Sequence, residues 1–143
     1  MKMEEIVEHW EVDSKIDHSE ITQVTTNIPI LHNKYYKMYI RERYAQKSME
    51  LELKRLKHEK FEFYSQGPNP DTPKEWKLPA IGKVLKSEVP TYVDTDPDII
   101  KATLKLYSQT EKVDYLDAII KMIVNRGYQV KSIIDWEKFK HGS

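Results

Sequence analysis

The stretch PILHNKYYKMYIRERYAQKSMELELKRLKHEKFEFY, residues 29–64, decides the fold of this chain. After its first residue it contains neither glycine nor proline, so nothing in it interrupts a helix. Apolar residues recur along it at three- and four-residue steps, namely Leu31, Tyr35, Met38, Ala45, Met49, Leu53, Leu56 and Phe63. This spacing predicts one helix over about 29–64, on the order of 50 Å long at ~1.5 Å per residue. A helix of that length needs a partner along it, either another helix or another subunit.

The segments beside this helix contain their own signals. Residues 3–16 predict a short, acidic, amphipathic helix. A further helical segment starts near Ser19, and Pro29 is expected to kink or restart it because proline lacks the backbone N–H. Gly67 and the three prolines at 68, 70 and 73 predict an exposed loop over 65–79. Residues 81–93 are expected to be irregular or a short strand.

The C-terminal part predicts further helices, over about 96–140. The run DTDP at 94–97 is a helix start, with an aspartate cap and proline in the first turn. Gly127 is expected to end the first of these helices in a left-handed conformation, and a last helix follows over about 129–140. The whole chain, residues 1–143, is therefore predicted to be one all-α domain with a long central helix.

The composition bounds the class of protein. The chain has 143 residues, of which 32% are charged and 39% hydrophobic, as expected for one soluble domain. Cysteine is absent, which excludes disulfides and thiolate zinc sites and favours a reducing cytoplasm. No apolar stretch approaches the ~20 residues that span a bilayer, so no membrane role is expected.

The sequence carries no signature of an enzyme. None of its four glycines lies in a Gly-rich phosphate loop. Asp94, Asp96 and Asp98 alternate like the start of a calcium loop, but the required glycine position holds Ile99 and the twelfth holds Lys105. The five histidines lack metal-ligand spacing, and no carboxylate has an apolar setting. We therefore expect no catalysis, no cofactor and no metal.

The net charge of zero conceals a segregation along the chain. Residues 1–20 have an excess of five acidic side chains, whereas residues 34–64 have an excess of four basic ones. On a helix, Lys54, Lys57 and His58 form a basic stripe. Cations bind phosphates, and aromatic rings offer faces on which unpaired bases stack. The candidate DNA-binding residues are Lys54, Arg55, Lys57, His58, Lys60, Phe61 and Tyr64.

The same stretch has a plainer interpretation. The charges could be a solvated helix face, with Phe61, Phe63 and Tyr64 covering the core. In that case the chain is a non-enzymatic helical scaffolding or assembly protein with no DNA role. The two hypotheses differ in whether the basic side chains face solvent or are paired with carboxylates.

The chain resembles the UvsY family, the recombination mediators of T-even-type tailed phages. The resemblance is most specific in the run NRGYQVKSIID at 125–135 and on to Phe139, where the family has an Arg-Gly-aromatic turn followed by a short amphipathic helix. A second match is the basic run that leads into Phe63-Tyr64-Ser65-Gln66-Gly67. The acidic N-terminal helix, the long helix and the loop after it follow in matching order.

The resemblance implies an all-helical protein that assembles into rings of six or seven subunits. Such proteins bind single-stranded DNA coated by single-strand DNA-binding protein, loosen that coat and help a RecA-like recombinase to load, in recombination, repair and replication. The implied partners are therefore single-stranded DNA, the recombinase, the single-strand DNA-binding protein and further copies of the chain. The implied location is the cytoplasm of the infected host cell.

The resemblance also implies site residues. The family's two key basic positions fall on His58 and Lys60. His58 departs from the family pattern because histidine is mostly neutral at pH 7, so Lys57 or Lys54 is the alternative phosphate ligand. The C-terminal helices are implied to assemble the ring, with the oligomerisation candidates Ile119, Ile123, Val130, Ile133, Ile134 and Phe139. A ring repeats the basic stripe, so one strand would engage many copies at high effective concentration.

Overall fold

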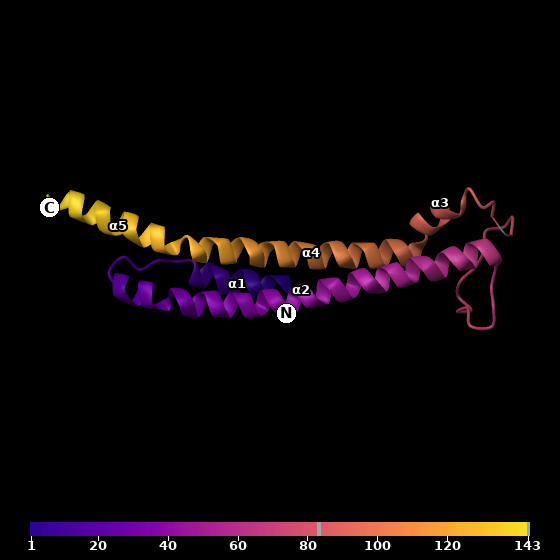
Figure 1. Ribbon diagram of the computed structural model, residues 1–143, viewed down its shortest axis with the longest axis horizontal. Helices are drawn as coiled ribbons and strands as arrows, with labels where there is room; N and C mark the ends of the chain where they lie inside the picture. The colour runs from indigo at the N-terminus through magenta and orange to yellow at the C-terminus, as the bar shows by residue number, and fades with distance from the viewer. Residues whose placement is uncertain (83, 143) are drawn as a thin grey trace. The chain divides into compact units, whose positions relative to one another are not determined.

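The computed structural model describes residues 1–82 and 84–142 (Figure 1). Its helices, in chain order, are α1 (Met3–Asp13), α2 (Ile21–Gln66), α3 (Val89–Asp94), α4 (Pro97–Val124) and α5 (Arg126–Lys140). The described residues contain no strand, which confirms the all-α prediction and corrects the alternative of a short strand within 81–93. Residue 83 of that segment lies outside the described part. None of the described helices is long and apolar enough to span a bilayer.

The long helix α2 begins earlier than predicted and passes through Pro29 without a break. The expected restart at this proline is wrong, whereas the expected kink stays a prediction. Proline removes one backbone hydrogen bond, but Ile28 before it and Leu31 after it both pack against the same apolar cluster. Tertiary packing on both sides therefore keeps the helix continuous. The N-terminal helix α1 is shorter than the predicted 3–16, because it ends at Asp13.

The contacts of the chain gather in two compact units. Unit 1 comprises Met1–Tyr44 with Thr110–Ser143, and unit 2 comprises Ala45–Gln109. Each unit has a hydrophobic core of its own. The single domain inferred from length therefore stays a prediction, and each unit is described by itself.

Unit 1 is built from α1, the first half of α2, the C-terminal part of α4 and α5, with α1 alongside α2 (Figure 1). Trp10 of α1 packs edge-on against Tyr35 of α2, with ring centroids 5.4 Å apart. The Asp13 carboxylate accepts hydrogen bonds from Lys34 at 2.6 Å and from the Tyr35 hydroxyl at 2.7 Å. The buried Arg126 donates to the carbonyls of Asp13 and Ser14, both at 3.0 Å, which closes the C-terminal end of α1. The core side chains are Ile6, Tyr35, Leu116, Ile119 and Ile123.

Unit 2 is built from the second half of α2, the connection to α3, α3 itself and the start of α4. Gly67, with φ 83°, follows the last turn of α2, and its N–H donates to the Phe63 carbonyl at 2.9 Å. A left-handed residue here ends the helix, and only glycine adopts that conformation without strain. The core side chains are Leu53, Phe63, Tyr64, Val84, Val89, Val93 and Ile99.

The start of α4 confirms the predicted cap, whereas its end does not fit the prediction. Asp96 Oδ1 accepts hydrogen bonds from the N–H groups of Asp98 at 2.9 Å and Ile99 at 3.4 Å, and Pro97 is the first helical residue. Gly127, in contrast, lies inside α5 and is not among the glycines with positive φ. The expected left-handed cap is wrong because the chain resumes a helix directly after Asn125 and needs no reversal there.

Candidate nucleic-acid interface

The predicted basic stripe occupies the second half of α2, in unit 2. Lys54, Arg55, Lys57 and His58 are all exposed, and the Phe61 ring is 42% exposed one turn after Lys57 and His58. The helix is uninterrupted here because charged residues alternate with apolar ones and neither glycine nor proline occurs. Cations and a ring thus share the solvent side of one rigid helix.

Two lysines of this stripe are free of ion pairs. No carboxylate of the described residues lies within 4.0 Å of the Lys54 or Lys57 ammonium. These two side chains therefore present their whole charge to solvent, where a phosphate can reach it. They are the two lysines that the sequence analysis gave as alternative phosphate ligands, because His58 stands where the family has a key basic residue.

Two neighbouring cations are already paired along the helix. Arg55 contacts the carboxylate of Glu52 at 2.7 Å and that of Glu59 at 3.2 Å, and the bond to Glu52 raises the pKa of Arg55. His58 Nε2 lies 3.1 Å from a Glu62 oxygen. Exposed pairs of this kind contribute at most about 1 kcal/mol, so a phosphate can compete with them. Arg55 and His58 remain accessible, but less of their charge is available.

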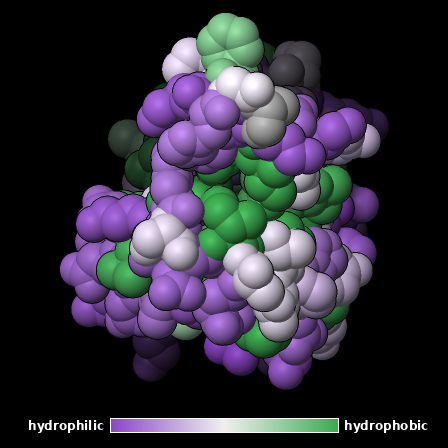
Figure 2. Space-filling view, turned by 90° about the vertical axis from the view of Figure 1, so that its left-hand side faces the viewer, coloured by the Kyte–Doolittle hydropathy of each residue, from purple (hydrophilic) through white to green (hydrophobic). Residues whose placement is uncertain are grey.

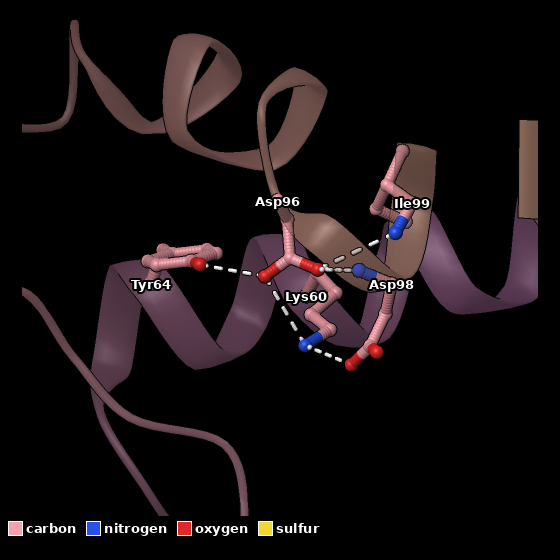
Figure 3. A network of polar contacts seen from close by, with 5 residues as sticks. All are labelled: Lys60, Tyr64, Asp96, Asp98 and Ile99. Carbon is pink, nitrogen blue, oxygen red and sulfur yellow. Dashed lines mark hydrogen bonds and ion pairs between the residues drawn. The ribbon is translucent and has the colours of Figure 1, made fainter. Parts of the chain in front are cut away.

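Lys60 and Tyr64 do not face solvent, which corrects their inclusion among the strand-facing residues. The Lys60 side chain is only 3% exposed, and its Nζ lies 3.1 Å from Asp96 and 2.9 Å from Asp98 (Figure 3). The same ammonium sits 3.8 Å from the centroid of the Trp76 ring. The Tyr64 hydroxyl donates to Asp96 Oδ2 at 2.6 Å. These two residues tie α2 to the start of α4 instead of contacting a strand.

The reason is the position of Lys60 on the helix. It follows Leu53 by seven residues and Leu56 by four, so it lies on the core side of α2. That spacing was readable from the sequence. Its acceptors Asp96 and Asp98 are 36 and 38 positions away, and no local pattern indicated them.

The network is balanced in its charges. Burial by itself would raise the pKa of Asp96, but the hydrogen bonds from Tyr64 and Lys60 outweigh it and hold that pKa below its ordinary value. Burial, and then the bond to Asp96, raise the pKa of the Tyr64 hydroxyl. An ionised Asp96 therefore accepts from a protonated Tyr64 and a charged Lys60, and the Lys60 charge is neutralised inside the protein.

The stability contributed by Asp96 has a definite dependence on pH. Because its folded pKa lies below the ~3.9 of an unfolded aspartate, the contribution is complete above that value and is lost as the pH falls through the folded pKa. We expect the difference in free energy of unfolding between wild type and Asp96→Asn to be constant between about pH 7 and 5 and to shrink below about pH 4. Urea unfolding at a series of pH values measures it, and a difference that grows in acid would contradict the assignment.

The oligomerisation candidates fall into two groups. Ile119, Ile123 and Val130 are 2%, 0% and 6% exposed, so their side chains are buried within their own unit, and a role for them in assembly stays a prediction. Ile133 is partly buried. Ile134 and Phe139 of α5 are 38% and 74% exposed, which keeps them available for another subunit.

Trp136 of α5, which the sequence analysis did not single out, pairs with the predicted Phe139. Trp136 is 58% exposed and stacks on Phe139, with ring centroids 5.6 Å apart. Figure 2, which faces the end of unit 1 where α5 finishes, shows apolar side chains open to solvent among polar ones. Large exposed apolar groups on a short helix are typical of a protein contact.

The fold and this surface together define a class of protein. It is all-helical, and the solvent side of its long central helix carries two lysines without an ion pair among the described residues and an exposed aromatic ring. In the described residues, no three His, Cys, Asp or Glu side chains gather to hold a metal ion. Residues 9–143 match the family described as "Recombination, repair and ssDNA binding protein UvsY". The chain belongs to the UvsY family, as the resemblance in its basic run and its C-terminal turn predicted.

Solved structures agree with this membership. The chain is similar to crystal structures of the bacteriophage T4 recombination mediator protein UvsY in three lattices. Lattice type II gives a TM-score of 0.83 at 21% identity over 99% of this chain and 98% of that one. Type I gives 0.79 at 20% over 95% and 98%, and type IV gives 0.78 at 19% over 98% and 99%. At these identities the likeness establishes the fold. A search of curated proteins gave no match.

Proposed function

We propose that this chain is a recombination mediator that performs no chemistry itself. It binds single-stranded DNA, helps to displace single-strand DNA-binding protein and loads a RecA-like recombinase. It does so as a homo-oligomer of six or seven subunits, in which the exposed side chains of α5 contribute to assembly. Ile134, Trp136 and Phe139 are the residues proposed for those contacts.

One observation carries the DNA-binding part of the proposal. Lys54 and Lys57 are exposed cations without ion pairs, and the exposed Phe61 ring lies on the same stretch of α2. Phosphates have a strong electrostatic preference for such lysines, and the ring offers a face on which an unpaired base stacks. Arg55 and His58 join the contact at the cost of weak surface pairs. Lys60 and Tyr64 hold the end of this helix in place from inside.

Affinity for oligo(dT) as a function of salt tests the proposal. The double substitution Lys54→Ala with Lys57→Ala is expected to weaken binding about tenfold or more. It should also reduce the slope of log affinity against log salt by about 1.4 for each subunit that touches the strand, because every such subunit loses two phosphate contacts at ~0.7 each. Fluorescence anisotropy of a labelled oligonucleotide, recorded from low to moderate salt, gives both quantities.

The matched control is Lys101→Ala with Lys105→Ala, two exposed lysines of α4 in the same unit. This variant removes the same charge from a different helix and is expected to change the affinity much less. If wild type does not bind, or binds with no salt dependence, the proposal fails and the scaffolding alternative gains. If both double variants weaken binding equally, the effect is one of overall charge and the assignment to α2 fails.

A further inference from the structure

A second aromatic and basic surface occurs on α2 within unit 1. Four of the nine tyrosines lie within ten residues, at positions 35, 36, 39 and 44. Tyr35 is buried and bonded to Asp13, but Tyr36 is 45% and Tyr44 is 76% exposed. Tyr36 stacks near-parallel on His32 at 5.7 Å and on Tyr39 at 6.2 Å between ring centroids. A row of ordered rings thus follows the helix on its solvent side.

Cations accompany this row. Lys37 and Arg41, next to Tyr36 and Ile40 in sequence, are exposed and have no carboxylate within 4.0 Å in the described part of the chain. The one carboxylate between Tyr36 and Tyr44 is Glu42, which is 5% exposed and lies 3.1 Å from Lys112. The exposed side of this segment therefore carries positive charge without a matching acid.

The geometry of the helix gathers these side chains on one face. Tyr36, Ile40 and Tyr44 are four residues apart, so they lie in one row, with Lys37 and Arg41 in the adjacent row. Ile40 is also half exposed, at 52%. The core of unit 1 is formed around Tyr35, and Tyr39 packs against it, so core packing accounts for Tyr39 but not for the exposed rings of Tyr36 and Tyr44.

Acidic side chains limit this surface on one side. Glu5 and Glu8 of α1 line a hollow beside Lys34. Carboxylates repel phosphates, so an anionic chain is disfavoured at this hollow on α1. Charge and ring placement together select the kind of partner.

We propose that Tyr36, Lys37, Arg41 and Tyr44 form a second contact surface for single-stranded nucleic acid. This inference rests on the proposed function and adds a surface in unit 1 to the stripe in unit 2. Bases stack on the Tyr36 and Tyr44 rings, and Lys37 and Arg41 bind the phosphates between them. Tyr44 is 76% exposed and has the larger open ring surface of the two, whereas Tyr36 offers the 45% of its surface that His32 and Tyr39 leave exposed.

The test is Tyr36→Ala with Tyr44→Ala, measured on the full chain with oligo(dT). Loss of two stacking rings is expected to weaken binding about tenfold to a hundredfold. The matched control, Tyr36→Phe with Tyr44→Phe, keeps both rings and is expected to bind like wild type. Lys37→Ala with Arg41→Ala should reduce the salt slope by about 1.4 for each subunit that touches the strand. Unchanged affinity in the alanine variant, or equal loss in the phenylalanine control, overturns the inference.

The outcome separates this inference from the proposed function. If the Lys54 and Lys57 variant weakens binding while the Tyr36 and Tyr44 variant does not, the second surface fails and the function stands. If wild type does not bind oligo(dT), the function itself fails. Wild-type protein crosslinked to a strand containing 5-iododeoxyuridine gives a readout that needs no variant. Crosslinks at Tyr36 or Tyr44 are expected, and crosslinks confined to other residues overturn the inference.

Discussion

Asp96→Ala is expected to lower the free energy of unfolding by about 3–5 kcal/mol, the range for breaking a buried ion pair by removing one partner. Three interactions are lost together. The Lys60 ammonium, 3% exposed, keeps only the half-exposed Asp98 as a counter-ion. The buried Tyr64 hydroxyl loses its acceptor, and the N–H groups at the start of α4 lose their cap.

Urea unfolding followed by circular dichroism measures this loss. The control is Asp98→Ala, because the Asp98 side chain is 52% exposed and contacts only one of the same partners, Lys60. That variant is expected to lose about 1 kcal/mol, since solvent replaces much of an exposed carboxylate's contribution. If the two variants lose equal stability, Asp96 does not have the central position assigned to it.

A double variant at Lys60 and Asp96 separates the effect of their charges on stability from the effect of their packing. Replacing both Lys60 and Asp96 by apolar residues removes the buried charges in a pair, and such exchanges are often close to neutral for stability. The cap of α4 and the acceptor of Tyr64 would still be lost in that variant. The network therefore fixes the position of the helix end that bears Lys54 and Lys57 more than it adds net stability.

The sequence was sufficient for the fold class because its strongest signals were local. Absence of glycine and proline after Pro29 predicted a long helix, and the DTDP run predicted the start of α4. The predictions of a helix restart at Pro29 and of a left-handed cap at Gly127 were wrong, because each considered only the backbone preference of that residue. Packing of Ile28 and Leu31 outweighs the first preference, and the immediate start of α5 makes the second unnecessary.

The candidate site was predictable only in part. Lys54 and Lys57 lie beside the apolar side of α2, and their long side chains reach solvent from there. Burial of Lys60 follows from the same periodicity, but its basic character favoured grouping it with the surface stripe. The acids that neutralise it come from a segment distant in sequence, and that contact depends on tertiary structure. The ring row around Tyr36 was visible in the sequence as a tyrosine cluster, but its exposure and stacking were not.

These placements also explain how a neutral chain can favour an anionic partner. Basic side chains inside the protein are balanced by buried or nearby acids, as Lys60 is by Asp96 and Asp98. Lys54 and Lys57 are not balanced in this way, because no carboxylate of the described residues lies within 4.0 Å of either ammonium, although the sum of charges over the chain is zero. Repetition of that surface in an oligomer multiplies the effect without any new contact type.

Ile123→Ala is expected to lower the free energy of unfolding by about 2–5 kcal/mol, through lost burial and the cavity left behind. The side chain is 0% exposed and packs in the unit 1 core with Ile6, Tyr35 and Leu116. Its effect should therefore be on the folding of the subunit. Urea unfolding of wild type and variant at equal protein concentration measures it, because assembly makes apparent stability depend on concentration.

The control is Phe139→Ala on α5, where the ring is 74% exposed and stacks only on Trp136 among the rings of the described residues. Its removal is expected to change subunit stability by no more than about 0.5 kcal/mol but to lower the molar mass in light scattering. The two variants thus assign opposite roles to residues that the sequence grouped together as assembly contacts. A stable Ile123→Ala subunit that no longer assembles would reverse the assignment, and Ile123 would then belong to the interface instead of the core.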